Sequence, residues 1–452
     1  MLPLTAALTI ALSAWGAQAA RAGPEGSGKR LNVLIVSACS LRRDHIGLYG
    51  YPQETAPNLR RFSEHAFVFR NAYASKSWSG PGYFLPEIPI PELKSLGYEK
   101  IELPGARAFE SAEIAQERGK ERSLRLERLE DAAEYRRRFV LSTDILPGYH
   151  DDGLREIKEA LQKRRERPFF LHVHFKYMHR PYYPPELAEP APDFPAAQQP
   201  LLARYLAGQP AGLEKAPIYA ILLDRDDQLL RLVPLDFQGS PLGLLNRREI
   251  LDRWQKSPDY AQDIKLIVSA YDWKLRRFDA TIGDLLALYG DEELRDNTVV
   301  FFLGDHGEPF MEHGFLMHGE TVHDEEIAVP LLVRFPAGSG QRIIRRQFNQ
   351  HSLVAVIRSI LQGRLSGAGF ARYLDDRVHD DLSFATNFRF TQRGVRASNK
   401  WKFIYDFGTG ERRLYDLEKD PGETADVFAE HADVAAQLED ALLSRPGPPS
   451  QW

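Results

Sequence analysis

Residues 298–336 have the sequence TVVFFLGDHGEPFMEHGFLMHGETVHDEEIAVPLLVRFP, in which two apolar runs flank a polar, histidine-rich stretch. The runs Thr298–Leu303 and Val329–Phe335 are nearly continuous in β-branched and aromatic residues, which is typical of strands covered on both faces. Asp305 and His306 follow the first run closely. Because ligands of open parallel sheets bind beyond the carboxyl ends of the strands, the stretch predicts a ligand site at a strand end.

Two further apolar runs, Asn32–Ala38 and Phe169–Phe175, have the same character. Helical patterns lie between the runs. Ile264–Tyr289 has apolar residues at spacings of three and four, and Asp151–Arg164 is predicted to be an amphipathic helix. Strands that alternate with helices predict an α/β fold, a doubly wound and mostly parallel sheet flanked by helices.

We expect the main α/β domain to cover residues 30–365, with a peripheral insertion at about 184–262 that begins in a Pro/Ala-rich stretch. Residues 366–452 are predicted to form a small antiparallel C-terminal subdomain. Within it, the aromatic-rich runs Trp401–Tyr405 and Arg412–Leu417 flank a glycine-containing turn and predict a hairpin.

The start of the chain predicts export. An apolar stretch from Leu2 to Trp15 ends in the small-residue pattern Ala17-Gln18-Ala19, so we expect residues 1–20 to be a signal peptide and the protein to be periplasmic or extracellular. We expect no membrane span after signal removal, because the remaining apolar segments are too short to cross a bilayer.

The formal net charge of −5 gives no sign of nucleic-acid binding. Cys39 is the only cysteine, so an intrachain disulfide is excluded.

Chemically active side chains follow three of the predicted strands: Cys39 and Ser40, Lys176 and His179, and Asp305, His306 and His318. A carboxylate and an imidazole leaving one strand end, as Asp305 and His306 do, can both bind a divalent cation. The alternative is a helix-capping Asp beside a structural His. His172 and His174 share one strand face, and we interpret both as packed and hydrogen-bonded rather than catalytic.

The stretch around Asp305-His306 resembles the segment of the sulfatase family, within the alkaline-phosphatase-like superfamily, in which an Asp-His pair binds metal and a later His, here His318, faces the substrate oxyanion. Residues 31–81 are similar to the family's N-terminal block, with TAPNLRRF and NAYASKSWSGP. PFFLHVHFKYMHRPYYPP looks like the strand and loop that place a substrate-contacting His, here His179, and GVRASNKWKFIYDFGTGERRLYDLEKDPGE resembles the closing hairpin. The resemblance implies the fold predicted above and a site for anionic esters.

This chain departs from the family pattern at two places. The family has one or two Asp residues directly after the first strand as metal ligands, where this chain has Cys39 and Ser40. A thiolate can bind Zn but suits Ca or Mg poorly, and the alternative for Cys39 is a small buried apolar residue. In Ser79-Gly80-Pro81-Gly82-Tyr83, Tyr83 replaces the Arg of the formylglycine signature, so we do not expect formylglycine. Ser79 could attack directly as an alkoxide, or be a turn serine before Gly-Pro.

Three functions remain open. The first is a sulfatase-like hydrolase of sulfate or phosphate monoesters that uses metal-assisted in-line displacement. The second is a phospho- or sulfo-group transferase acting on an envelope glycan or lipid, and the third a non-catalytic sulfatase-fold protein that binds anionic glycans or a partner protein. The expected partners are sulfated or phosphorylated small molecules or glycans. The expected site residues are Ser79, Lys176, His179 and His318 for catalysis, and Asp305, His306 and Cys39 for a divalent metal ion (Ca, Mg, Mn or Zn).

Overall fold

The computed structural model describes residues 30–78, 96, 140–141, 168–175, 177–178, 182, 190–207, 248–287, 292–316, 318–336, 340–376, 382–387, 390–398 and 400–445. The predicted signal peptide at 1–20, the predicted helix at Asp151–Arg164 and a large part of the predicted insertion lie outside these residues.

The described strands of the larger sheet are β1 (Asn32–Ala38), β2 (Phe67–Tyr73), β3 (Val140–Leu141), β4 (Phe170–Phe175), β5 (Thr298–Gly304), β6 (Leu331–Arg334) and β7 (Arg342–Asn349). They are ordered β3-β4-β1-β5-β6-β2-β7. Strand β6 runs antiparallel to β5 and β2, and the other neighbouring pairs are parallel. The mostly parallel sheet and its four apolar strands β1, β4, β5 and β6 are confirmed. Strands β2 and β7 contain more polar residues, and hydropathy alone missed them.

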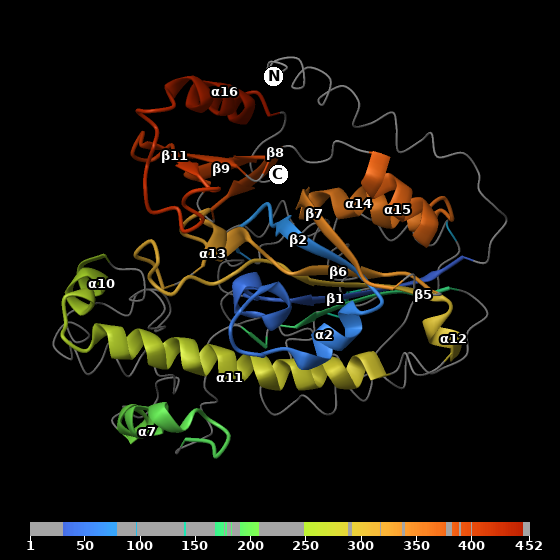
Figure 1. The fold of residues 1–452 in the computed structure, drawn as a ribbon, viewed down its shortest axis with the longest axis horizontal. Helices are drawn as coiled ribbons and strands as arrows, with labels where there is room; N and C mark the ends of the chain where they lie inside the picture. The colour runs from blue at the N-terminus through green and yellow to red at the C-terminus, as the bar shows by residue number, and fades with distance from the viewer. Residues whose placement is uncertain are drawn as a thin grey trace, which may run out of the picture.

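Helices cover both faces of this sheet (Figure 1). On one face lie α2 (Pro57–Ser63) and the long α11 (Tyr260–Leu286), and on the other lie α14 (Leu353–Leu361) and α15 (Gly367–Asp376). The shorter described helices are η2 (Arg43–His45), η3 (Gly47–Tyr49), η5 (Ala196–Gln198), α7 (Gln199–Ala207), α10 (Arg248–Gln255), α12 (Glu292–Arg295), α13 (Asp324–Ile327) and η8 (Gln350–Ser352). The doubly wound arrangement is therefore confirmed.

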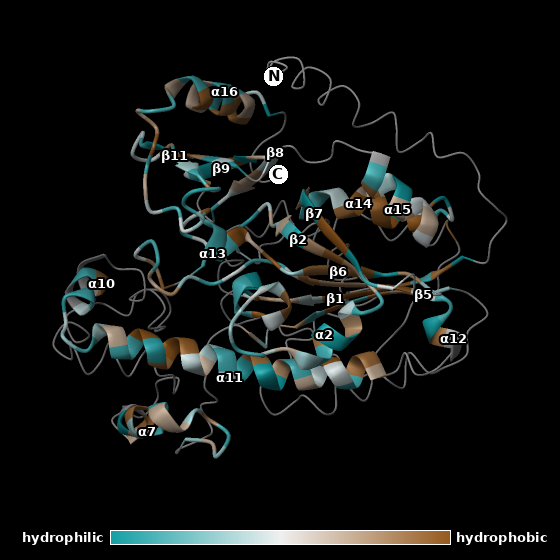
Figure 2. Cartoon of the chain, viewed as in Figure 1, coloured by the Kyte–Doolittle hydropathy of each residue, from teal (hydrophilic) through white to brown (hydrophobic). Residues whose placement is uncertain are grey.

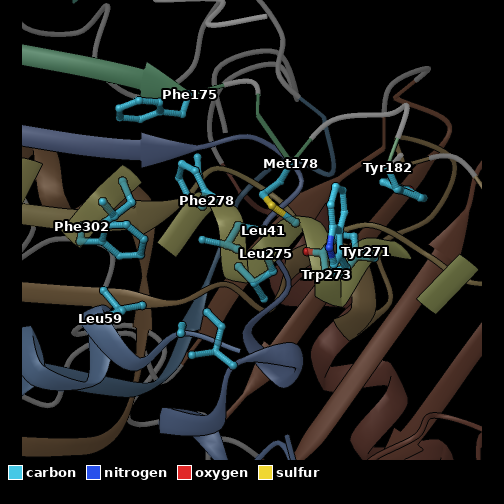
Figure 3. Packing of buried hydrophobic residues seen from close by; sticks show 14 of the residues in the cluster. Leu41, Leu59, Phe175, Met178, Tyr182, Tyr271, Trp273, Leu275, Phe278 and Phe302 are labelled. Carbon is cyan, nitrogen blue, oxygen red and sulfur yellow. The ribbon is translucent and has the colours of Figure 1, made fainter. Parts of the chain in front are cut away.

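Alternate residues of β1 enter different cores, which explains its unbroken apolar sequence. Leu34 and Val36 pack with α11 and α2, whereas Val33 and Ile35 pack with α14 and α15. Successive strand side chains point to opposite faces, so a strand between two helical layers needs apolar residues at every position. In Figure 3, Phe278 of α11 lies near the buried residues of the first core, and its ring centroid is 5.5 Å from that of Phe175 in β4.

The helix predicted at Ile264–Tyr289 is the 27-residue α11. Hydrophilic and hydrophobic residues alternate along it (Figure 2), because one side contacts the sheet and the other does not. Within the described parts of the chain, no helix is both long enough and apolar enough to cross a membrane.

A second, antiparallel sheet has the described strands β8 (Leu382–Thr386), β9 (Gln392–Ala397), β10 (Trp401–Asp406) and β11 (Arg412–Asp416), ordered β11-β10-β9-β8. It packs against α16 (Ala432–Leu443). The predicted hairpin is β10–β11, with Phe403 opposite Leu414. Phe370 and Leu374 of α15 belong to the core of the larger sheet, so this helix packs with the main domain although it follows residue 366.

The two sheets contact each other around α13, which lies between them in Figure 1. Tyr73 forms a β-bridge with Ala328, and Lys76 forms one with Thr386. A small shared core contains residues of both parts, including Tyr73 from β2 and Ile404 from β10. The smaller sheet therefore packs against the polar stretch that follows β5, which includes α13.

Candidate active site

The register of the central strands brings Cys39 and Asp305 to the same edge of the sheet. Ala38, the last residue of β1, lies opposite both Phe175 of β4 and Gly304 of β5. The Asp305 amide donates to the Ala38 carbonyl (3.0 Å), and the Cys39 amide donates to the Phe175 carbonyl (2.8 Å). Both residues therefore leave neighbouring strands at the same level.

The Asp305 carboxylate is buried and uses its two oxygens differently. Oδ1 accepts from the backbone amides of Ser40 (3.2 Å) and His306 (2.6 Å). Oδ2 lies 3.7 Å from Nε2 of His174. The backbone bonds orient the carboxylate and direct its second oxygen toward His174.

The His306 ring is fully buried, and one of its nitrogens is directed toward Cys39. Nδ1 lies 2.7 Å from the Gly307 carbonyl, which can only accept, so Nδ1 carries the proton. Nε2 lies 3.6 Å from Cys39 Sγ and 3.6 Å from Asp305 Oδ1. Burial lowers the pKa of His306 to about 4, despite the opposing effect of Asp305, so the ring is neutral near pH 7. A neutral imidazole with its Nε2 lone pair at this point is the form that binds a metal.

His318 lies beside this pair. Its ring centroid is 4.3 Å from that of His306, and its Nδ1 lies 3.0 and 3.1 Å from the two oxygens of buried Glu308. The Glu308 carboxylate fixes the ring orientation and makes Nε2 the nitrogen presented to a ligand. The structure thus brings four sequence-predicted residues together: Cys39, Asp305, His306 and His318.

The loop that carries His318 is held by a buried carboxylate that sequence reasoning missed. Glu326 of α13 accepts from the amides of Gly319 (2.6 Å) and Thr321 (3.2 Å). Burial raises the pKa of Glu326 well above its usual value, and its neighbour Glu325 raises it further. Glu326 therefore acts as an internal anchor for the loop rather than as a surface charge.

His174 belongs to the site, although its strand position suggested a packing role. Ser37 Oγ lies 2.7 Å from His172 Nε2 and 2.8 Å from His174 Nδ1, so the predicted hydrogen bonding of both rings is present. The Nε2 of His174 faces Asp305, however, and ligand atoms of Cys39, His174 and Asp305 all lie within 4.8 Å of one another. A signal was available in the sequence, since His174 is the penultimate residue of a strand that ends at this edge.

Ser40 has a left-handed backbone (φ 55°), which is uncommon for a residue other than glycine. Its carbonyl accepts from the hydroxyl of Tyr271 in α11 (2.7 Å), which in turn accepts from the Arg42 amide (2.9 Å). A residue keeps such a strained backbone where several surrounding contacts hold it in place. Such residues are often found at functional sites. Tyr271 is thus a supporting residue that hydropathy alone assigned to the core.

Other polar residues near the strand ends serve the framework. The Arg42 guanidinium lies between Asp44 (2.7 Å) and Glu312 (2.5 Å), so its charge is compensated within the chain. The rings of His313 and His323 stack with centroids 3.6 Å apart. His313 contacts the Glu325 carboxylate and the Glu423 carbonyl, and His323 contacts Thr321 and the Tyr415 hydroxyl.

Residues 31–84 and 97–362 match the sulfatase family model, which covers well over half of the chain. The chain belongs to the sulfatase family. Arylsulfatase K of Gallus gallus is 25% identical over 260 residues, which are 52% of this chain and 45% of that protein. N-acetylgalactosamine-6-O-sulfatase of Bacteroides thetaiotaomicron is 22% identical over 205 residues, 37% of this chain and 40% of that protein. The matched part of this chain thus spans less than half of either relative.

Solved structures support the fold of this sulfatase-family chain. The phosphonate monoester hydrolase of Agrobacterium radiobacter has a TM-score of 0.52 at 16% identity, covering 92% of this chain and 95% of that one. A 2-O GAG sulfatase has a TM-score of 0.57 at 14% identity, covering 92% and 91%. At these identities the likeness concerns the fold alone.

The donor atoms at the strand ends suit a divalent cation, as the family implies. They comprise one carboxylate, two imidazoles and one thiol, from Asp305, His174, His306 and Cys39. Such O, N and S donors bind divalent metals in proteins. Only one of these four residues offers oxygen, however, and the number of oxygen ligands affects which ion binds.

Three residues predicted for catalysis, Ser79, Lys176 and His179, lie outside the described residues, and their roles stay predictions. The described chain before Ser79 ends at Trp78. There the Ser77 amide donates to the Thr386 carbonyl of β8 (3.2 Å), and Lys76 pairs with the same strand residue. The smaller sheet thus holds the family segment that precedes the predicted nucleophile.

Proposed function

We propose that this protein is a sulfatase-like hydrolase that cleaves sulfate or phosphate monoesters of a small molecule or glycan. The observation that carries the proposal is the convergence of Asp305, His306 and His318, with Cys39, at the carboxyl ends of the parallel strands β1 and β5. Family membership supports the reaction class, and the N-acetylgalactosamine-6-O-sulfatase relative supports a sulfated glycan as substrate.

The site residues divide into two roles. Asp305, His306 and Cys39 would hold a divalent cation, which would supply Lewis-acid polarisation of the ester. His318 lies at the edge of this group. Glu308 holds its Nδ1, which leaves Nε2 to contact the non-bridging oxygens of a bound substrate. Lys176 and His179 are proposed to add positive charge there, on the basis of their place after β4 in the sequence.

Ser79 is the proposed nucleophile, on the basis of sequence order alone. Its oxygen forms a bond to sulfur or phosphorus while the bond to the substrate alcohol breaks, and the proton that Ser79 loses balances the one that the alcohol gains. Water then cleaves the enzyme ester, which releases sulfate or phosphate and restores the serine. Export to the periplasm or the exterior is a further proposal, based on residues 1–20.

The test is turnover of aryl sulfate and aryl phosphate by the full chain, compared with Asp305→Asn, His318→Asn and Ser79→Ala. We expect each substitution to lower kcat/KM by about 10²-fold or more, because each removes a group that contacts the ion, the reacting atoms or the developing charge. Asp296→Asn is the matched control. Asp296 precedes the same strand, β5, and its side chain is 56% exposed, so we expect unchanged turnover.

Two results would contradict the proposal. Wild-type protein that folds and binds metal but turns over neither ester would favour a non-catalytic, anion-binding protein. Product that forms only when a sugar or lipid acceptor is added, without hydrolysis, would favour the transferase.

A further inference from the structure

Ligand atoms of Cys39, His174 and Asp305 at the strand ends all lie within 4.8 Å of one another, and His306 lies beside this set. Cys39 Sγ is 3.6 Å from His306 Nε2, which is 3.6 Å from Asp305 Oδ1. On the other side, His174 Nε2 is 3.7 Å from Asp305 Oδ2. Bond lengths of about 2.3 Å to sulfur and about 2.0 Å to nitrogen or oxygen set the ligand atoms of a tetrahedral zinc site roughly 3.3–3.5 Å apart. The three separations given above exceed these values by a few tenths of an ångström, and the other pairs among Cys39, His174 and Asp305 lie within 4.8 Å, so the side chains would have to move closer to bind one ion.

The chemistry of the donors selects between kinds of ion. Hard ions such as Ca²⁺ take roughly six to eight oxygen ligands, and Mg²⁺ also prefers oxygen. The described cluster of Cys39, His174 and Asp305 offers one sulfur, one nitrogen and one carboxylate oxygen, and His306 adds a second nitrogen. Thiolate and imidazole suit Zn²⁺ and its close relatives.

Each imidazole is held through its other nitrogen. His174 Nδ1 bonds Ser37 Oγ (2.8 Å), and His306 Nδ1 bonds the Gly307 carbonyl (2.7 Å). Outer partners of this kind fix the ring orientation of metal-binding histidines and present Nε2 to the ion. All four donor residues are buried, with Cys39 1% and His306 0% exposed. Both rings are therefore held in orientations that direct Nε2 toward the strand ends.

We propose that this site binds zinc or a similar thiolate-accepting ion through Cys39, His174, Asp305 and His306, rather than a hard, oxygen-preferring ion. The inference assigns His174 as a ligand. It concerns the same site as the proposed function and depends on its location, but not on turnover. A buried Cys39 that only packs against His306 is the competing explanation.

The test replaces the metal with Co²⁺, whose thiolate complexes show a charge-transfer band in the near ultraviolet. Because Cys39 is the only cysteine, a band from the metal-free, full-length protein titrated with one equivalent of Co²⁺ identifies Cys39 as a ligand. We expect the band in wild type and its loss in Cys39→Ser. We also expect Zn²⁺ affinity, measured by competition with a chelator, to fall by at least about 10–100-fold in Cys39→Ser and His174→Asn, because loss of an outer hydrogen-bond partner alone costs this much.

A second variant tests the preference for the ion. Cys39→Asp restores an oxygen donor at this position and should shift the ratio of affinities from Zn²⁺ toward Mn²⁺ or Ca²⁺. Thermal unfolding of each variant without metal checks that the fold persists. The wild-type spectrum and affinities decide the matter even if a variant does not fold.

The inference is overturned if wild type binds Ca²⁺ or Mn²⁺ more tightly than Zn²⁺, if its Co²⁺ complex lacks the thiolate band, or if Cys39→Asp leaves the preference unchanged. These outcomes differ from failure of the proposed function. Tight zinc binding without ester turnover supports the zinc site and contradicts the hydrolase. Ester turnover that depends on Ca²⁺ but not on Zn²⁺ supports the hydrolase and contradicts the zinc site.

Discussion

At the scale of single residues, the site requires the backbone at Gly307 to lie very close to the backbone of α13, in addition to the donor side chains. Gly307, directly after His306, donates its amide to the Glu326 carbonyl (2.7 Å). A Cβ atom at Gly307 would lie 2.0 Å from the carbonyl oxygen of Glu325. Only glycine permits this contact, which ties the segment after β5 to α13. The Asp-His-Gly sequence is therefore set by packing at its third position and by chemistry at the first two.

Gly307→Ala should lower the free energy of unfolding by about 1–3 kcal/mol, because the new methyl group forces two backbone segments apart. Urea unfolding followed by circular dichroism measures the change. Gly422→Ala is the control, since its Cβ would meet Thr424 Cγ2 at an ordinary 3.6 Å. We expect the control to stay within about 0.5 kcal/mol of wild type. Equal stability of both variants would show that the contact is not tight in solution.

At the scale of elements, α13 connects the site to the smaller sheet through buried charges. Asp324, the first residue of α13, accepts from Arg396 of β9 (2.7 Å) and from Lys402 of β10 (2.9 Å). Lys402 Nζ also lies 2.7 Å from Glu423 Oε1, and both side chains are 1% exposed. Burial alone would lower the pKa of Lys402, but the carboxylates Asp324 and Glu423 raise it above its usual value. The smaller sheet therefore holds the helix that carries Glu326, the anchor of the His318 loop.

Lys402→Met should destabilise the protein by about 3–5 kcal/mol, because it leaves two carboxylates buried beside a neutral side chain. Lys400→Met is the matched control two residues earlier. Lys400 pairs with Glu418 at 3.2 Å, and the two side chains are 43% and 64% exposed. An exposed pair of this kind contributes about 0–1 kcal/mol. Unfolding curves that show the same loss for both variants would contradict the structural role assigned to Lys402.

At the scale of the whole molecule, attachment of the smaller sheet should weaken in acid. Burial by itself would raise the pKa of Asp324, but Arg396, Lys402 and Arg43 outweigh it and hold this pKa below its usual 3.8. A carboxyl group whose pKa is lower in the folded state contributes stability that is fully present above its unfolded pKa. That contribution is lost as the pH falls below about 4 and toward the folded pKa.

Asp324→Asn should therefore be less stable than wild type at pH 7, by on the order of 2 kcal/mol, and the difference should shrink as the pH falls below about 4. Unfolding free energies at pH 7, 5, 4 and 3 measure the trend. Asp193→Asn removes a carboxylate whose side chain is 59% exposed, and we expect little difference from wild type across this range. A gap between wild type and Asp324→Asn that does not change with pH would refute the assigned pKa direction.

The sequence by itself determined the α/β class, the four apolar strands, the long helix α11 and the C-terminal hairpin. Local hydropathy suffices for these elements, because a strand between two helical layers must be apolar at every position. It also singled out Asp305, His306 and His318 as candidate site residues, through their place after a strand and their likeness to the sulfatase family. Hydropathy did not predict strands β2 and β7, because polar residues such as Arg70 and Arg345 interrupt their apolar pattern.

Only the tertiary structure decided which of these side chains meet. His174 and Asp305 are 131 positions apart, and their contact depends on the register of β4 against β1 and of β1 against β5. The partners of Glu326, Tyr271 and Lys402 likewise come from other elements. Strand composition predicts that a residue is buried, but the hydrogen bonds across neighbouring strands determine which donor atoms share a point in space.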